Sequence, residues 1–110
     1  MKVKILVADD HALIRKGVIS VLTRHDPEWE VFEAENGIQA IMVASDVKPD
    51  IILMDYMMPK LDGMNASIAI RKEVPGAKII LVSMDMSEDL IINMINAGVI
   101  HGYCPKRFSA

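Results

Sequence analysis

The sequence is poor in cysteine and in long apolar runs. Cys104 is its single cysteine, so no internal disulfide can form, and the residues around it match no zinc motif. No apolar stretch reaches the roughly 18 to 20 residues that cross a bilayer. The short apolar run before Asp9 lacks a small-residue cleavage site, which argues against a secretory signal. We therefore expect a cytoplasmic protein without membrane contact, in which Cys104 is a small core residue.

Basic clusters, linkers and repeats are also absent from the sequence. Lysines and arginines are scattered in ones and twos, and the formal net charge is −3, so we expect no direct nucleic-acid binding by this chain. Any such binding would require an output domain in a longer protein. The 110 residues are 52% hydrophobic and 25% charged, which predicts one globular domain over residues 1–110.

Five short apolar runs are each about the length of a strand. Most of them lack an alternating polar face, which is typical of parallel strands buried on both sides. The five predicted strands are Val3–Ala8, Val31–Ala34, Ile51–Met54, Ile79–Val82 and Val99–Cys104.

The segments between these runs show helical spacing or helix boundaries. A third helix is expected over Asn65–Glu73 and a fourth over about Ser87–Ala97. Asn36-Gly37 is interpreted as a turn, Pro75-Gly76 as the end of the third helix, and Gly98 as a glycine cap. The stripes that predict the first two helices are Ile14, Val18, Val21 and Leu22, and then Ile38, Ile41, Ala44 and Ser45.

Alternating strands and helices predict a three-layer, doubly wound α/β fold. Right-handed crossovers place helices on both faces of a parallel five-stranded sheet, and the flavodoxin-like strand order 2-1-3-4-5 is the obvious candidate. Such sheets bind ligands at the carboxyl ends of their strands.

Polar residues follow four of the predicted strands at that edge. Asp9 and Asp10 follow the first strand, Asp55 the third, Ser83 the fourth and Lys106 the fifth. Taken singly, each has an ordinary interpretation as a helix cap, a turn residue or a surface charge. Their joint occurrence at one edge of a parallel sheet favours a functional site.

Three clustered carboxylates require a compensating cation, because they repel one another and raise one another's pKa. Mg²⁺ fits best, since it binds one or two carboxylates, keeps waters and shares its other positions with phosphate. Asp55 beside such an ion can attack phosphorus and form an aspartyl phosphate, with Lys106 stabilising the charge and the Ser83 hydroxyl donating a hydrogen bond.

Four segments of the sequence carry a family resemblance: Ile5–Asp10, Asp50–Gly63 with Met58-Pro59 and Asp62-Gly63, Ile80–Ser83, and Gly102–Lys106. With these segments the sequence resembles the receiver domain of two-component response regulators over nearly its whole length. The central block that contains Asp55 is the most specific part of the resemblance.

The resemblance implies a role for each matching residue. Asp55 is similar to the phosphoacceptor, Asp9 and Asp10 to the acidic pair that holds Mg²⁺, and Met57 to the residue whose carbonyl binds the metal. Ser83 and Lys106 resemble the hydroxyl and lysine that contact the phosphoryl group, and Ser83 with Tyr103 resembles the switch pair. Tyr103 is equally well explained as a packing aromatic.

The resemblance also implies partners and a function. The donor would be a sensor histidine kinase or a phosphotransfer protein, and the chain would catalyse its own phosphorylation and slow dephosphorylation without being a metabolic enzyme. Phosphorylation would shift a two-state surface around the fourth helix and fifth strand.

Receivers end with a fifth helix, whereas this sequence stops at Ala110, where that helix should begin. We therefore expect the fifth helix to be absent or stunted, with part of the sheet and of the first helix left bare. The fourth helix spreads apolar residues over more than one stripe. Both features predict self-association as a dimer, with exchange of an element between protomers as one route.

Two alternatives differ from a phosphorylation switch. A haloacid dehalogenase also forms an aspartyl phosphate, but Met57 stands where that class has a second aspartate. The other alternative is a phosphorylation-independent interaction or dimerisation module that uses the face of the fourth helix.

Overall fold

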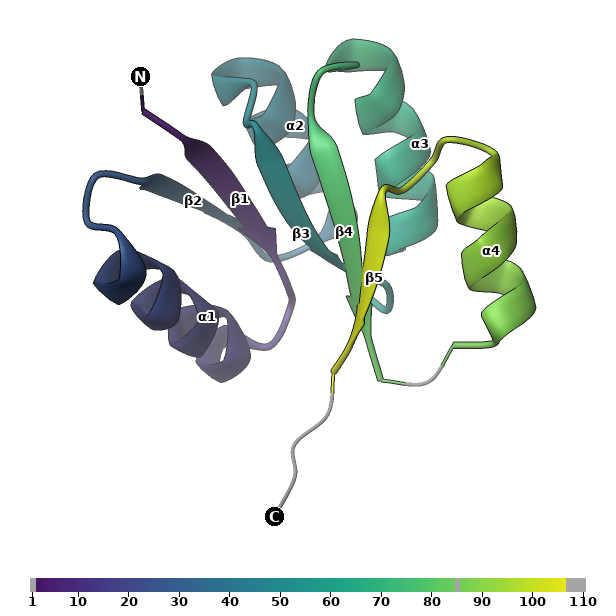
Figure 1. Cartoon of the computed structure of the whole chain (residues 1–110), viewed down its shortest axis with the longest axis horizontal. Helices are drawn as coiled ribbons and strands as arrows, with labels where there is room; N and C mark the ends of the chain where they lie inside the picture. Colours follow the sequence, from purple (N-terminus) through teal and green to yellow (C-terminus); the bar gives the residue numbers. More distant parts are fainter. Residues whose placement is uncertain (1, 85, 107–110) are drawn as a thin grey trace.

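The computed structural model describes residues 2–84 and 86–106, which form one parallel sheet with helices on both sides (Figure 1). The sheet has the order β2-β1-β3-β4-β5, so the predicted flavodoxin-like fold and strand order are confirmed. The elements are β1 (Lys4–Ala8), α1 (Ala12–His25), β2 (Glu30–Ala34), α2 (Gly37–Val47), β3 (Ile51–Asp55), α3 (Gly63–Glu73), β4 (Lys78–Ser83), α4 (Glu88–Asn96) and β5 (Gly102–Pro105).

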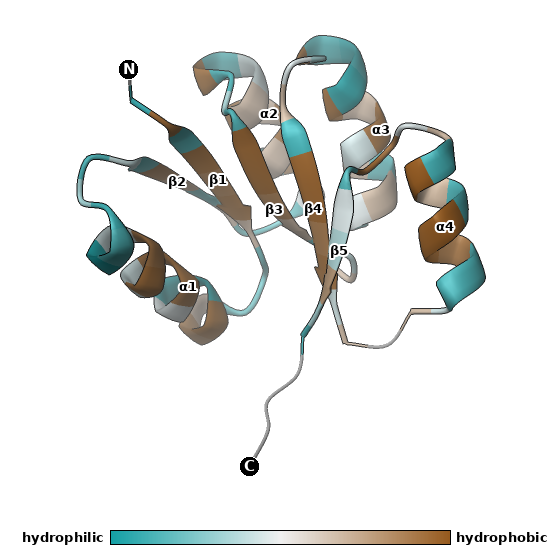
Figure 2. Ribbon diagram, viewed as in Figure 1, coloured by the Kyte–Doolittle hydropathy of each residue, from teal (hydrophilic) through white to brown (hydrophobic). Residues whose placement is uncertain are grey.

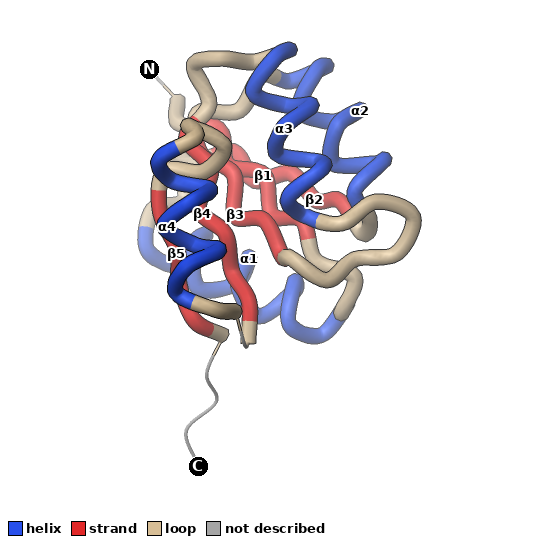
Figure 3. The backbone as a smooth tube through the Cα atoms, turned by 90° about the vertical axis from the view of Figure 1, so that its right-hand side faces the viewer, coloured by secondary structure: helices blue, strands red, loops and turns tan. Residues whose placement is uncertain are grey.

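The main core lies between the sheet and the layer that contains α2 and α3. Figure 3 shows these two helices on one side of the sheet and α1 on the other. Met94 of α4 is buried against the same core. The strand residues that face this layer are fully buried, namely Leu6, Ile52, Met54, Ile79 and Leu81.

The opposite face of the sheet is only partly covered. Leu53 and Val82 point toward this side and are half-buried, while Leu13 and Val21 of α1 are 87% and 58% exposed. Figure 2 shows the apolar residues along α1. The expected bare surface on the first helix is therefore confirmed. The expectation of an absent fifth helix concerns positions from Arg107 onward, which lie outside the described residues.

Helices α2, α3 and α4 begin at side-chain caps. Asn36 caps α2 by accepting a hydrogen bond from the Gln39 N–H at 2.8 Å, so Asn36-Gly37 starts a helix and the prediction of a turn was wrong. The apolar stripe predicted for this helix was right in part, because Ala44 is buried and Ile41 packs against the core, whereas Ile38 is 45% exposed. Ala40, which the stripe left out, is also buried. The small alanines let α2 lie close to the sheet.

The predicted fifth strand began too early because its first residues complete the end of α4. Gly98 has φ +75°, and the N–H groups of Gly98 and Val99 donate to the carbonyls of Ile95 and Met94 at 3.0 and 2.9 Å. This Schellman motif confirms the predicted glycine cap. The pairing of β5 with β4 starts only at Gly102.

Cys104 is exposed, so its assignment to the core was wrong. It lies on edge strand β5 and pairs in register with Val82, on the face that α1 covers only in part. Within the described part of the chain, no helix is long and apolar enough to cross a membrane.

Gly63 packs closely beside β3, and Gly17 in α1 provides a control for a test of this packing. A Cβ on Gly63 would overlap the backbone carbonyl oxygen of Asp55, whereas a Cβ on Gly17 in α1 meets nothing within 4 Å. We predict that Gly63→Ala lowers the free energy of unfolding by about 2 kcal/mol or more, and that Gly17→Ala raises it by up to about 1 kcal/mol. Urea unfolding measures both values, and equal effects of the two substitutions would contradict this account.

Candidate functional site

Strands β1 and β3 place two aspartates side by side at the carboxyl edge of the sheet. Ala8 pairs in register with Met54, so the next residues, Asp9 and Asp55, lie side by side at this edge. The Asp9 N–H donates to the carbonyl of Ala34 on β2 at 3.0 Å, which continues the sheet pattern one residue further. The aspartates are 5% exposed each, so their negative charges lie close together and away from water.

Lys106 places a buried ammonium group between these aspartates. Its Nζ lies 2.7 Å from Asp9 Oδ2 and 3.4 Å from Asp55 Oδ1, and its side chain is 7% exposed. The backbone N–H of Lys106 donates to the carbonyl of Ser83 at 2.7 Å. The end of β4 therefore holds Lys106 in position, and Lys106 compensates the charges of Asp9 and Asp55.

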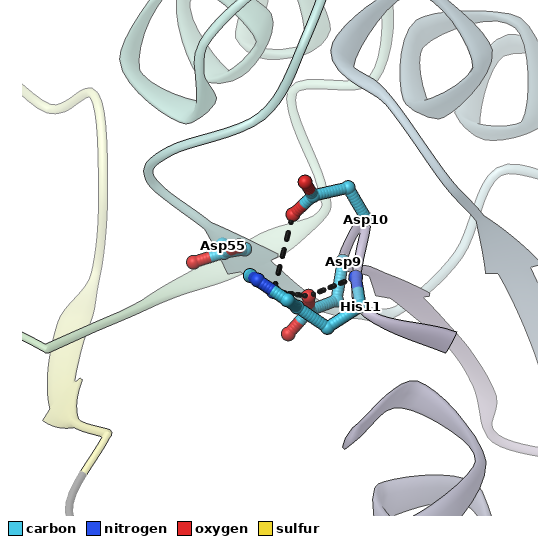
Figure 4. A group of neighbouring side chains, drawn as sticks. All are labelled: Asp9, Asp10, His11 and Asp55. Carbon is cyan, nitrogen blue, oxygen red and sulfur yellow. Dashed lines mark hydrogen bonds and ion pairs between the residues drawn. The ribbon is translucent and has the colours of Figure 1, made fainter. Parts of the chain in front are cut away.

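His11 joins the acidic cluster, and sequence reasoning had missed it. Its Nδ1 lies 3.0 Å from Asp9 Oδ1 and 3.3 Å from Asp10 Oδ1, and its backbone N–H donates to Asp9 Oδ1 at 2.8 Å. Figure 4 shows Asp9, Asp10 and His11 converging with Asp55. The signal in the sequence was the contiguous Asp-Asp-His triplet.

Arg15 supports the same loop from the first turn of α1 and was also missed. Its Nη1 donates to the backbone carbonyl of Asp9 at 2.6 Å, and its Nε donates to Glu33 Oε1 at 2.8 Å. The hydrogen bond from Arg15, followed by that from Lys16, lowers the pKa of Glu33. Arg15 is the buried residue of α1, and a basic residue next to the apolar Ile14 was the available signal.

The environment makes the two buried aspartates electrostatically different. Burial and the charge of Asp9 raise the pKa of Asp55 to about 6, against opposing effects of Lys106. Burial would also raise the pKa of Asp9, but hydrogen bonds from Lys106 and from the His11 backbone outweigh it and leave that pKa lowered. Asp55 Oδ2 is buried without a hydrogen-bond partner among the described residues.

A cleft of about 310 Å³ opens onto Asp55. Ser83 and Lys106 reach it from the ends of β4 and β5, so the structure brings the predicted hydroxyl and lysine to the same opening as Asp55. The Tyr103 hydroxyl donates to the backbone carbonyl of Ser83 at 3.1 Å, which places Tyr103 beside this end of the sheet. The cleft is lined by His11, Asp55, Tyr56, Met57, Ser83, Met84 and Lys106.

The donor set fits a hard divalent cation. Asp9, Asp10, His11 and Asp55 each offer a ligand atom, and these atoms lie within 4.8 Å of one another. Three of the four residues offer carboxylate oxygens, the ligands that Mg²⁺ and Ca²⁺ prefer. Asp55 Oδ2, which finds no partner in the described part of the chain, is a buried acceptor that a ligand would satisfy.

A doubly wound sheet with three aspartates and a lysine at its carboxyl edge defines a class of α/β domains with a buried acidic site. The family model of the response regulator receiver domain matches residues 5–110, and the chain belongs to this family. The predicted family is thereby confirmed, and the haloacid dehalogenase alternative is not supported.

Known proteins are similar along the whole chain. The response regulator protein VraR of Staphylococcus aureus is 34% identical over 110 residues, which cover 100% of this chain and 52% of the relative. The chain thus spans about half the length of the curated relatives it matches.

Solved structures show the same fold. The chemotaxis protein CheY4 of Vibrio cholerae has a TM-score of 0.86 at 25% identity, covering 99% of this chain and 90% of that one. The receiver domain of the putative response regulator NarL of Mycobacterium tuberculosis has a TM-score of 0.85 at 29% identity, covering 98% and 86%.

The raised pKa of Asp55 predicts a pH-dependent stability. Between its ordinary pKa of 3.8 and its folded pKa of about 6, the folded state keeps a proton that the unfolded state has lost. Stability linked to Asp55 is therefore full below about pH 4 and is lost as the pH rises through 6. Without divalent ions, Asp55→Asn should raise the free energy of unfolding at pH 7.5 by about 1–3 kcal/mol, and by much less at pH 4.5.

Urea unfolding in EDTA at the two pH values measures this difference. Asp46→Asn is the matched control, because Asp46 is an exposed aspartate on α2, and it should have a small effect at both. A gain from Asp55→Asn that is the same at pH 4.5 and pH 7.5 would show that the Asp55 carboxylate is not destabilised by burial.

Proposed function

We propose that this chain is a signalling switch that accepts a phosphoryl group on Asp55 in a Mg²⁺-dependent reaction. The observation that carries the proposal is the state of the Asp55 carboxylate. One oxygen lies 3.4 Å from the Lys106 ammonium, while the other is buried and has no partner within residues 2–84 and 86–106. Asp55 lines an open cleft. A carboxylate so placed is held beside a positive charge, in the wall of a cleft that a reactant can enter.

The transfer itself is a substitution at phosphorus. An Asp55 oxygen forms a new P–O bond, and the bond from phosphorus to the donor breaks, with its electron pair leaving on the donor atom. For a phosphohistidine donor this atom is an imidazole nitrogen, and for acetyl phosphate it is the acetate oxygen. Asp55 must be ionised to attack, and with a pKa of about 6 it is mostly ionised at neutral pH.

The acidic cluster is the candidate site for the metal. Asp9, Asp10 and Asp55, with the backbone carbonyl of Met57, would hold Mg²⁺ directly or through water. When bound, the ion neutralises charge on the transferring oxygens. Met57 lines the cleft next to Asp55, and its side chain points to solvent with 69% exposure, so the proposed ligand is its carbonyl.

Lys106 and Ser83 would stabilise the phosphorylated state. The Lys106 ammonium, already in contact with Asp55, would pair with a phosphoryl oxygen, and the Ser83 hydroxyl would donate to another. Movement of Ser83 toward the phosphoryl group would alter the backbone that accepts the Tyr103 hydroxyl bond. This coupling supports Ser83 and Tyr103 as the switch that carries the signal toward α4 and β5.

Membership of the receiver family supports a proposal for the partners and the compartment. The phosphoryl donor would be a sensor histidine kinase or a phosphotransfer protein, and the cytoplasm remains the expected compartment. Because the chain spans about half of its curated relatives, the output of the whole protein, including any contact with nucleic acid, would be the work of another domain.

The proposed reaction predicts an acyl phosphate on Asp55. Incubation with acetyl phosphate and Mg²⁺ should add one base-labile phosphoryl group to the wild-type chain, and omission of Mg²⁺ should reduce the yield by at least about tenfold, because the carboxylates then repel the incoming phosphate. Intact-mass spectrometry at acidic pH measures the adduct. Beryllofluoride binding, followed by ¹⁹F NMR, is an independent measurement.

Two substitutions test the assignment. Asp55→Asn should abolish the adduct, whereas Asp46→Asn on the surface of α2 should leave it unchanged. Labelling that persists in Asp55→Asn, or that does not need Mg²⁺, would contradict the proposed chemistry. No labelling in the folded wild-type chain would favour the interaction module, for which the exposed Ile92 and Ile95 of α4 (53% and 42%) offer a surface.

Exposed apolar residues on two helices predict self-association. Ile92 on α4 and Leu13 on α1 are 53% and 87% exposed, and burying them against a second copy would remove apolar area from water. Above micromolar concentrations we expect sedimentation equilibrium to give a mass greater than one chain. Ile92→Glu and Leu13→Glu would identify which helix forms the contact, and a wild-type monomer at these concentrations would contradict the expectation.

A further inference from the structure

His11 is placed among the acidic residues of the cluster in a way that an ordinary helix cap does not require. It occupies the N-cap position of α1 but makes no side-chain cap hydrogen bond. Its imidazole instead turns back to the loop and meets both carboxylates of the acidic pair through Nδ1 (Figure 4). The ring is still 58% exposed, so a small ion can reach it from solvent.

The spacing of these atoms matches neighbouring ligands around one ion. In an octahedral site with bonds of about 2.1 Å, adjacent ligand atoms lie about 3.0 Å apart. His11 Nδ1 lies 3.0 Å from Asp9 Oδ1 and 3.3 Å from Asp10 Oδ1. Asp9 Oδ2 contacts Lys106 at 2.7 Å, so Oδ1, which accepts from the His11 backbone N–H at 2.8 Å, is the Asp9 oxygen on the side of the imidazole.

A second observation points independently to a ligand at this place. Asp55 Oδ2 is buried and has no partner among the described residues. Asp55 also contributes a potential ligand atom to the group that contains His11. A buried carboxylate oxygen without a partner costs free energy unless a cation or donor satisfies it. Within the described residues, the cluster therefore combines an unsatisfied oxygen with an imidazole nitrogen that is spaced from its neighbours as ligands of one ion are.

We propose that His11 Nδ1 is an additional protein ligand, so that the cluster prefers divalent first-row transition ions to Mg²⁺. This inference rests on the proposed function, in which the cluster holds the metal for phosphoryl transfer. Mg²⁺ favours oxygen ligands, whereas imidazole suits Co²⁺, Ni²⁺ and Zn²⁺ and strengthens their binding to a carboxylate site. The availability of such an ion would then regulate how readily Asp55 is phosphorylated.

Metal affinity of the full chain tests the role of His11 without any measurement of activity. The test variant is His11→Asn, since asparagine is a good N-cap residue and keeps an N–H donor for the aspartates but removes the imidazole. The control is His25→Gln at the far end of α1, where His25 contacts Trp29 and no acidic cluster. Circular dichroism in EDTA verifies that both variants fold.

Calorimetric titration should show a clear difference between the two ions. For His11→Asn we expect the dissociation constant of Co²⁺ to rise by about tenfold or more, while that of Mg²⁺ stays within about twofold. His25→Gln should change neither. Equal weakening of both ions, or no weakening of either, would overturn the proposal and leave His11 as a hydrogen-bond donor that orders the acidic loop.

Spectroscopy gives a direct readout of the bond. The wild-type chain loaded with Mn²⁺ should show ¹⁴N modulation from a coordinated imidazole in electron spin-echo experiments, retained in His25→Gln and lost in His11→Asn. If Mg²⁺ binds but this nitrogen signal is absent, the inference about His11 fails and the proposed function stands. If neither Mg²⁺ nor Co²⁺ binds the wild-type chain, the metal requirement of the proposed function fails as well.

Discussion

The contact of Lys106 with two buried aspartates is the interaction on which the carboxyl edge of the sheet depends. Asp9 and Asp55 are 5% exposed each, and without a cation their repulsion and desolvation would favour the protonated forms. The ammonium group comes from the end of β5, whereas the carboxylates come from β1 and β3. Charge balance at the site therefore requires the whole sheet to be assembled in the order β2-β1-β3-β4-β5.

Lys106 compensates the charges of the two aspartates unequally, and this difference makes Asp55 the more reactive carboxylate. Lys106 lies closer to Asp9 than to Asp55 (2.7 against 3.4 Å), so Asp9 is held as the anion. Asp55 has a raised pKa, and one of its oxygens has no partner among the residues that the structure describes. The surrounding packing holds this arrangement in place. Gly63 lies against the Asp55 carbonyl with no room for a side chain, and Arg15 binds the carbonyl of Asp9.

Much of the fold could be predicted because periodicity and end signals are local. The five strands, the four described helices and the glycine cap at Gly98 follow from apolar runs, helical spacing and caps. The errors arose where packing overrides a local pattern. Ile38 faces solvent because Ala40 and Ala44 fit closely against the sheet, and Cys104 is exposed because β5 is an edge strand on the partly covered face.

The sequence by itself determined which residues stand at the ends of the strands. Because parallel strands bring their carboxyl ends to one edge, it also determined that these residues lie at the same edge of the sheet. Asp9, Asp55 and Lys106 could be grouped on that ground alone. Only the tertiary structure decided the distances among them, the burial of the Asp55 carboxylate and the position of His11 beside Asp9 and Asp10. These depend on side-chain directions and on burial, which residues distant in the chain set together and which no local pattern encodes.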